Sequence, residues 1–120
     1  MVESIDSLMP LKDLDETERQ IVRECLKASA TGPFFPMWEF HTLFGLEHQE
    51  VSDIAFGKNK LDDSHEDVGI AINNSLNNLT GYPHKCGKDV WDRFISVPPR
   101  EVRRIYTKWK VGASANGVAK

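Results

Sequence analysis

An unusual run of asparagines stands in the segment INNSLNNL. Asparagine forms helices poorly because its side-chain amide competes for backbone hydrogen bonds, and an ordinary helix surface more often carries Glu, Lys or Gln. Each amide offers two donors and an acceptor without a charge that must be desolvated. Two interpretations stay open: a polar network satisfied inside the fold, or a flat surface that recognises a partner. The residues are Asn73, Asn74, Asn77 and Asn78.

Carboxylates gather just before this asparagine run. Asp62, Asp63, Glu66 and Asp67 stand where a helix capped by Ser64 is expected to begin, and negative charge there suits the helix dipole. A solvated helix start explains them without any function. Beside the asparagines, however, they also offer an acidic surface to a basic protein. We therefore take these four carboxylates and the four asparagines as candidate partner-binding residues.

Cations recur every four residues near the end of the chain, at Arg100, Arg104 and Lys108. On a helix this spacing forms a stripe that could bind phosphates, with Trp109 available for stacking on a base. The alternative is that the long basic side chains solvate an outer face, while Trp109 belongs to a buried apolar stripe. The spacing of the apolar residues favours this second interpretation. The three cations remain the candidate residues of an alternative function as a nucleic-acid-associated regulator.

The segment LFGLEHQEVSDI resembles the turn of a helix-turn-helix motif. Gly45 stands where that motif has a left-handed residue, and Leu46, Val51 and Ile54 stand at its buried apolar positions. The helix that would read DNA carries three carboxylates and no Lys or Arg. Phosphates repel carboxylates, and Lys and Arg supply most of the affinity for DNA. We therefore do not expect this segment to bind DNA.

Motifs for catalysis or for a bound metal are weak in this sequence. His84 and Cys86 stand two residues apart, but no second pair of ligands has the spacing of a structural zinc site. Cys86, between Lys85 and Lys88, could be a reactive thiol with His84 as its base. There is no phosphate-binding glycine loop and no GxSxG motif. We expect no cofactor and no enzyme, and keep a small-molecule-binding protein or enzyme as the second alternative.

Helices must position all of these residues, because apolar side chains recur at helical spacing along the chain and no strand pattern is convincing. We predict an all-α fold, a compact single-domain bundle of five to six short helices. A leader over 1–12 and a flexible tail over 112–120 are expected to flank a helical domain over 13–111. The helices are expected to begin near Asp15, Pro36, Glu47, Ser64, Asp89 and Ser96.

Aromatic residues are concentrated within 34–44, where five of the eleven residues are Phe or Trp. Large aromatic side chains bury much apolar area, so we predict a core rather than an aromatic cage for a ligand. Replacing Trp38 or Trp91 by Ala is expected to cost about 3–5 kcal/mol. The core is predicted to form around Trp38, Phe40, Phe44, Leu76, Trp91 and Trp109.

Charge is segregated along the 120 residues, although the net charge is only −3. Residues 36–84 hold eight acidic and two basic side chains, whereas residues 85–110 hold three acidic and eight basic ones. Two cysteines cannot form a disulfide framework, no apolar run could span a membrane, and the N-terminal segment does not read as a secretory signal. We therefore expect a cytoplasmic protein.

Small acidic domains without catalytic motifs are typical of inhibitors and of bacterial immunity proteins, although no motif identifies a family. The function that we expect first is binding to a basic protein, such as a toxin or an enzyme, by covering its basic surface. On this interpretation we do not expect nucleic acid as a partner.

Overall fold

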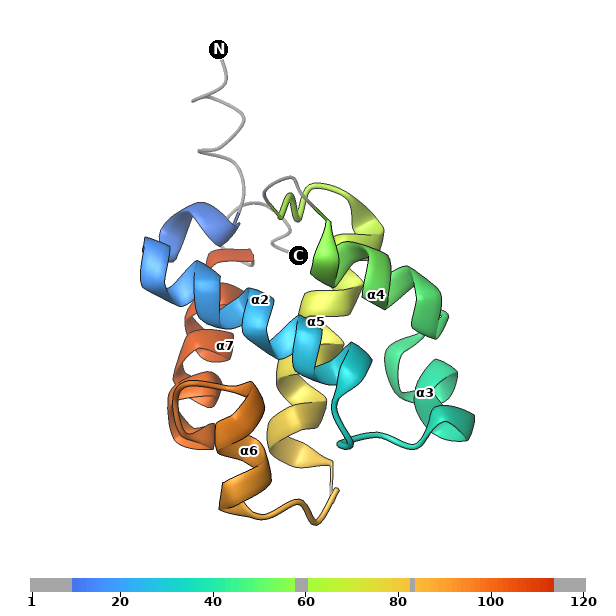
Figure 1. Ribbon diagram of the computed structural model, residues 1–120. Helices are drawn as coiled ribbons and strands as arrows, with labels where there is room; N and C mark the ends of the chain where they lie inside the picture. Colours follow the sequence, from blue (N-terminus) through green and yellow to red (C-terminus); the bar gives the residue numbers. More distant parts are fainter. Residues whose placement is uncertain (1–9, 58–60, 83, 114–120) are drawn as a thin grey trace.

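Six α-helices and one short 3-10 helix follow one another in the part of the chain that the structure describes, residues 10–57, 61–82 and 84–113 (Figure 1). The structure is a computed structural model. It confirms the predicted all-α fold and contains no strand in the described ranges. The elements are η1 (Pro10–Asp13), α2 (Glu16–Thr31), α3 (Met37–Phe44), α4 (His48–Phe56), α5 (Glu66–Gly81), α6 (Lys88–Phe94) and α7 (Pro99–Ala113).

Local hydrogen bonds determine where the first helices begin and end. The Asp15 carboxylate accepts from the Glu18 backbone N–H at 2.7 Å, and the Glu18 carboxylate accepts from the Asp15 N–H at 2.9 Å, which forms the predicted capping box of α2. Gly45 ends α3 with φ of +70°, in the left-handed region that glycine adopts without a steric penalty. A second capping box, formed by Glu47 and Glu50, begins α4.

The predicted start of α5 was wrong by one residue. His65, not Ser64, precedes the first helical residue, and it makes no side-chain capping bond. The Ser64 hydroxyl instead donates to Asp62 at 2.6 Å, and the Ser64 N–H donates to the same carboxylate oxygen at 3.1 Å. The Ser64 side chain thus bonds within this local turn instead of capping α5.

Helices α2 and α5 pack against each other at the centre of the bundle (Figure 1). Helix α4 packs on α2 and α3 packs on α5, while α7 packs on α5 and η1. Helices α3 and α4 therefore lie on one side of the central pair, and α6 and α7 lie on the other (Figure 1). None of the helices in these ranges is long and apolar enough to cross a membrane.

The core contains five of the six residues that were predicted to form it, and the prediction for the sixth, Trp38, was wrong. Trp38 is 82% exposed, and its neighbour Met37 is 64% exposed. Phe40 and Phe44 stack on the inner face of α3, with ring centroids 4.3 Å apart. Side chains two positions apart on a helix point about 200° away from each other. Because Phe40 faces the core, Trp38 faces outward. Phe40, Phe44, Leu76, Trp91 and Trp109 are buried as predicted.

Candidate functional site

Two of the asparagines attach α5 to the end of α3. The side-chain amide of Asn74 donates to the Phe44 carbonyl at 2.7 Å, and that of Asn78 donates to the Leu43 carbonyl at 3.0 Å. These carbonyls belong to the last turn of α3, where the helix itself provides no N–H partner. Asn74 and Asn78 therefore satisfy the C-terminus of α3 from a neighbouring helix.

Asn73 lies on the opposite flank of α5, toward α7. Its Oδ1 accepts from the Tyr106 hydroxyl at 2.9 Å and from Lys110 Nζ at 3.3 Å, and its Nδ2 donates to Asn74 Oδ1 at 3.1 Å. Asn77 is exposed between the two flanks. Asn73, Asn74 and Asn78 therefore belong to a polar network within the fold, which was the first interpretation of the asparagine run. Asn77 alone among the four faces outward.

The two carboxylates before α5, Asp62 and Asp63, have different surroundings. Asp62 accepts from Ser64 and lies 3.7 Å from His65 Nε2, and the bond from the Ser64 hydroxyl helps to hold the pKa of Asp62 below its usual value. Asp63 Oδ2 accepts from Trp109 Nε1 at 2.9 Å and from the Leu11 N–H at 3.3 Å. Burial raises the pKa of Asp63, against the lowering effect of these bonds. Asp63 therefore joins η1 to α7.

Glu66 and Asp67 are exposed in the first turn of α5. They belong to a larger acidic region, because residues 36–84 contain eight carboxylates and only two basic side chains, Lys58 and Lys60. Helices α3, α4 and the start of α5 form this half (Figure 1). Trp38 and Met37 are the exposed apolar side chains of α3 in the same half. We call its five exposed carboxylates, Glu47, Glu50, Asp53, Glu66 and Asp67, the acidic surface.

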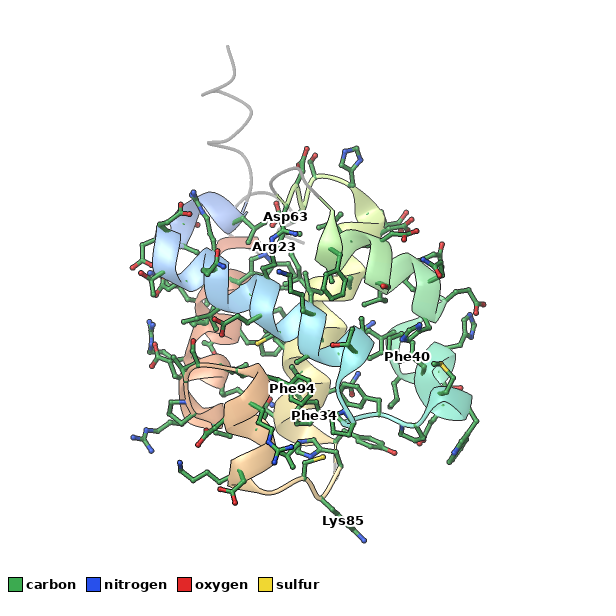
Figure 2. All side chains as sticks on the ribbon, in the orientation of Figure 1. Arg23, Phe34, Phe40, Asp63, Lys85 and Phe94 are labelled. Atoms are coloured by element: carbon green, nitrogen blue, oxygen red, sulfur yellow. The ribbon has the colours of Figure 1, made fainter. Side chains whose placement is uncertain are left out.

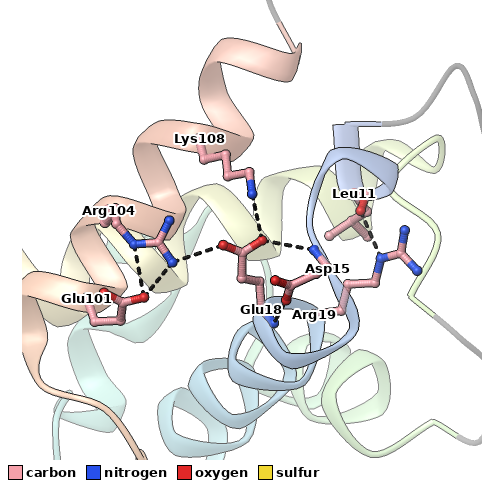
Figure 3. Close-up of polar contacts among 7 residues, drawn as sticks. All are labelled: Leu11, Asp15, Glu18, Arg19, Glu101, Arg104 and Lys108. Carbon is pink, nitrogen blue, oxygen red and sulfur yellow. Dashed lines mark hydrogen bonds and ion pairs between the residues drawn. The ribbon is translucent and has the colours of Figure 1, made fainter.

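Two of the three predicted nucleic-acid-binding cations instead bind one buried carboxylate (Figure 3). Arg104 and Lys108 each donate to Glu18 at 2.9 Å, and the Glu18 side chain is only 6% exposed. Burial would raise the pKa of Glu18, but the hydrogen bonds from Lys108, the Asp15 N–H and Arg104 lower it to about 2. Arg104 also pairs with Glu101. Arg104 and Lys108 thus join α7 to α2, and Arg100 is the member of the predicted stripe that does not contact Glu18.

The helix-turn-helix-like segment has part of the predicted geometry. Gly45 is left-handed, and Leu46 and Val51 are buried, while Ile54 is half-buried. Helix α4 presents Glu50 and Asp53 on its exposed side. The turn therefore packs α3 and α4 together, and the surface that it presents is acidic.

His84 and Cys86 lie close together but are not arranged as a base and a nucleophile. The Cys86 N–H donates to His84 Nδ1 at 3.0 Å, so Nε2 carries the proton and donates to the Leu79 carbonyl at 3.1 Å. Both ring nitrogens are thus occupied. Cys86 Sγ instead lies 3.7 Å from the Pro33 carbonyl oxygen.

The aromatic cluster beside this loop is closely packed. Phe34 makes edge contacts with His84, Trp91 and Phe94, and Lys85 projects away from the cluster (Figure 2).

Within the described ranges, no group of three or more His, Cys, Asp or Glu side chains could hold a metal ion.

Sequence reasoning missed the exposed position of Trp38 and the different surroundings of the cations of α7. Arg103 and Lys110, not the predicted Arg104 and Lys108, are the cations that lie outside the Glu18 cluster, over the ring of Tyr106. Helical spacing places Trp38 on the side of α3 opposite Phe40, but the residues of α3 alone do not show which of these two sides is buried.

A comparison of the chain with models of known protein families, with curated proteins and with solved structures finds no match.

Proposed function

We propose that this chain is a protein-binding module that covers a basic surface of its partner with its acidic half. The observation that carries the proposal is the charge of that half: residues 36–84 hold eight carboxylates against two basic side chains, Lys58 and Lys60. Like charges concentrated on one side steer an oppositely charged protein toward it and accelerate association.

Trp38 supplies the apolar contact that charge alone lacks. Exposed ion pairs contribute little net affinity, whereas a Trp that becomes buried at the centre of an interface is a frequent source of binding energy. Trp38 is 82% exposed and Met37 is 64% exposed, so both have apolar area to bury. A basic surface with an apolar socket is therefore the complement that we propose.

The specific form that we propose is an inhibitor or immunity-type protein, acting in the cytoplasm on a toxin or an enzyme with a basic cleft. Five exposed carboxylates can occupy positions that the phosphates of a substrate would take in such a cleft. The ionic contacts of Arg104 and Lys108 with Glu18 support this over the nucleic-acid alternative, because two of the three cations required by that alternative are paired within the fold.

Affinity capture from the source cells with matched variants tests the proposal. Asp53→Asn/Asp67→Asn removes two exposed carboxylates of the acidic surface, and Glu16→Gln/Asp89→Asn removes two exposed carboxylates elsewhere. We expect a basic protein to be retained by the wild type and by the control, and its association with the first variant to be slowed about tenfold at low salt. Equal retention by both variants would contradict the acidic surface as the binding site.

Trp38→Ala tests the apolar contact in the same assay, with Val111→Ala as the control because Val111 is also an exposed apolar side chain, on α7. We expect Trp38→Ala to weaken binding of the captured protein by about tenfold or more, measured by calorimetry with the purified partner. Unchanged affinity would exclude Trp38 from the interface.

A further inference from the structure

Three cations on the outer side of α7 make no ion pair within the described part of the chain. The guanidinium carbon of Arg103 lies 5.2 Å from the ring centroid of Tyr106, and Lys110 Nζ lies 5.8 Å from it. Arg100 is exposed in the first turn of the same helix. Contacts with an aromatic ring orient cations without neutralising their charge. We call Arg100, Arg103 and Lys110 the cationic face.

Helix α5 borders the cationic face with uncharged groups. Asn73 Oδ1 accepts from Lys110 Nζ, and Asn77 is exposed on the next turn. A Cβ atom placed on Gly81 would lie 3.8 Å from an Arg103 guanidinium nitrogen, so Arg103 reaches the end of α5. Residues 68–81 contain no carboxylate. On α7 only Glu101, which is paired with Arg104 and also interacts with Arg100, opposes the positive charge of this face, and the part of α5 beside it carries no carboxylate.

We infer that the cationic face binds the acidic surface of a second copy of this chain, head to tail. The two surfaces are complementary in charge, one on the outer side of α7 and the other on α4 and the start of α5. Helix α4 lies across the central pair of helices from α7, whereas the start of α5 follows Asp63, which bonds to Trp109 of α7 (Figure 1). Both remain exposed in a single copy, so each can face a different neighbour. A contact between two different patches is heterologous, and it continues into a ring or an open chain.

A second copy is a better occupant of this face than nucleic acid. The net charge of −3 and the acidic surface repel a polyanion, whereas a second copy offers five carboxylates that already need a basic complement. The contact is expected to be weak and sensitive to salt, because exposed charges contribute modestly and are screened. The inference shares the acidic surface with the proposed function, and it adds the cationic face, which the proposed function does not use.

Sedimentation velocity of the purified chain tests the inference. We expect the weight-average mass to rise above that of the monomer with increasing concentration at about 20 mM salt, and to return to the monomer at about 500 mM salt. Arg103→Gln/Lys110→Gln is expected to remain monomeric at both salt concentrations. Lys88→Gln/Arg93→Gln makes the same change in net charge on α6 and is expected to associate like the wild type.

Mixing two neutralised variants gives the sharpest test. Asp53→Asn/Asp67→Asn retains the cationic face, and Arg103→Gln/Lys110→Gln retains the acidic surface. Each is expected to be monomeric alone, and their mixture is expected to form a 1:1 complex that grows no further, because each copy then carries one intact surface. A monomeric wild type at low salt, or a mixture that stays monomeric, would overturn the inference.

Nucleic acid is the competing outcome, tested with a fluorescent single-stranded oligonucleotide at low salt. Binding that Arg103→Gln/Lys110→Gln abolishes, with a wild type that does not self-associate, would overturn the inference in favour of a nucleic-acid surface. Capture of the basic partner by Arg103→Gln/Lys110→Gln separates the two proposals, since the proposed function requires it to be unchanged. Loss of self-association with retained capture supports both.

Discussion

Glu18 is expected to contribute more to stability than any other single charge described above, and Glu18→Gln tests this. The substitution keeps the shape of the side chain and its ability to accept from the Asp15 N–H. It removes the negative charge that Arg104 and Lys108 each contact at 2.9 Å. Figure 3 shows both cations converging on this carboxylate from α7.

The expected magnitude follows from the pKa of Glu18. A fall from the ordinary value of 4.5 to about 2 corresponds to at most about 3.5 kcal/mol, since one pKa unit is worth about 1.4 kcal/mol. Arg104 and Lys108 are 51% and 42% exposed and can be solvated again after the substitution. Allowing for this screening, we expect Glu18→Gln to lower the free energy of unfolding by about 2 kcal/mol at pH 7.

The effect must depend on pH in a defined direction. A carboxylate whose pKa is lowered by folding stabilises the protein above its unfolded-state pKa, and this contribution is lost as the pH falls toward the folded-state value. The difference between wild type and Glu18→Gln is therefore expected to be full above about pH 5 and to shrink toward pH 2.

Urea unfolding followed by Trp fluorescence at several pH values measures this difference, because Trp91 and Trp109 are buried. Glu16→Gln removes an exposed carboxylate from the same helical turn and is expected to change stability by less than about 0.5 kcal/mol. A loss below about 0.5 kcal/mol for Glu18→Gln at pH 7 would refute the reasoning. So would a loss that is the same at pH 3 and pH 7.

Three further predictions concern thermal or urea unfolding. Trp91→Ala is expected to cost about 3–5 kcal/mol, whereas Trp38→Ala is expected to cost less than about 0.5, and equal losses would contradict the exposed position of Trp38. Gly45→Ala is expected to cost about 1 kcal/mol because its φ is +70°, with a smaller loss for Gly45→Asn; equal stability of Gly45→Ala and wild type would argue against a left-handed residue there. Asn74→Ala is expected to cost about 1–3 kcal/mol by leaving the Phe44 carbonyl without its donor, and Asn77→Ala on the exposed side is expected to be nearly neutral; the reverse order would be incompatible with the network.

Features that depend on near neighbours in the chain were predictable from the residues. The capping box of Asp15 and Glu18 and the left-handed Gly45 require only residues within one or two helical turns. The acidic and basic segments of the chain also lie apart in the fold, because α3 and α4 pack on one side of the central helices and α6 and α7 on the other (Figure 1). The start of α5 was misplaced because two side chains, Asp62 and Ser64, bonded to each other in preference to capping the helix.

The orientation of α3 could not be derived from its own residues. Five of the eight residues in MWEFHTLF are apolar, and they surround much of the helix, so the pattern does not define which side is buried. Its neighbours in space decide: Asn74 and Asn78 bind its last carbonyls from α5, and the stacked pair of Phe40 and Phe44 fills the core. Trp38 consequently faces outward.

The residues alone determined the helical class, most helix ends and the division of charge, because backbone propensity, capping and periodicity act over a few residues. Only the tertiary structure decided which charged and amide groups are consumed inside the fold. Glu18 is 86 and 90 residues from Arg104 and Lys108, and the Asn74 amide is 30 residues from its acceptor. Such pairings depend on how helices pack, and this packing separates Arg104 and Lys108, which bind Glu18, from Arg100, Arg103 and Lys110, which remain exposed without an ion pair among the described residues.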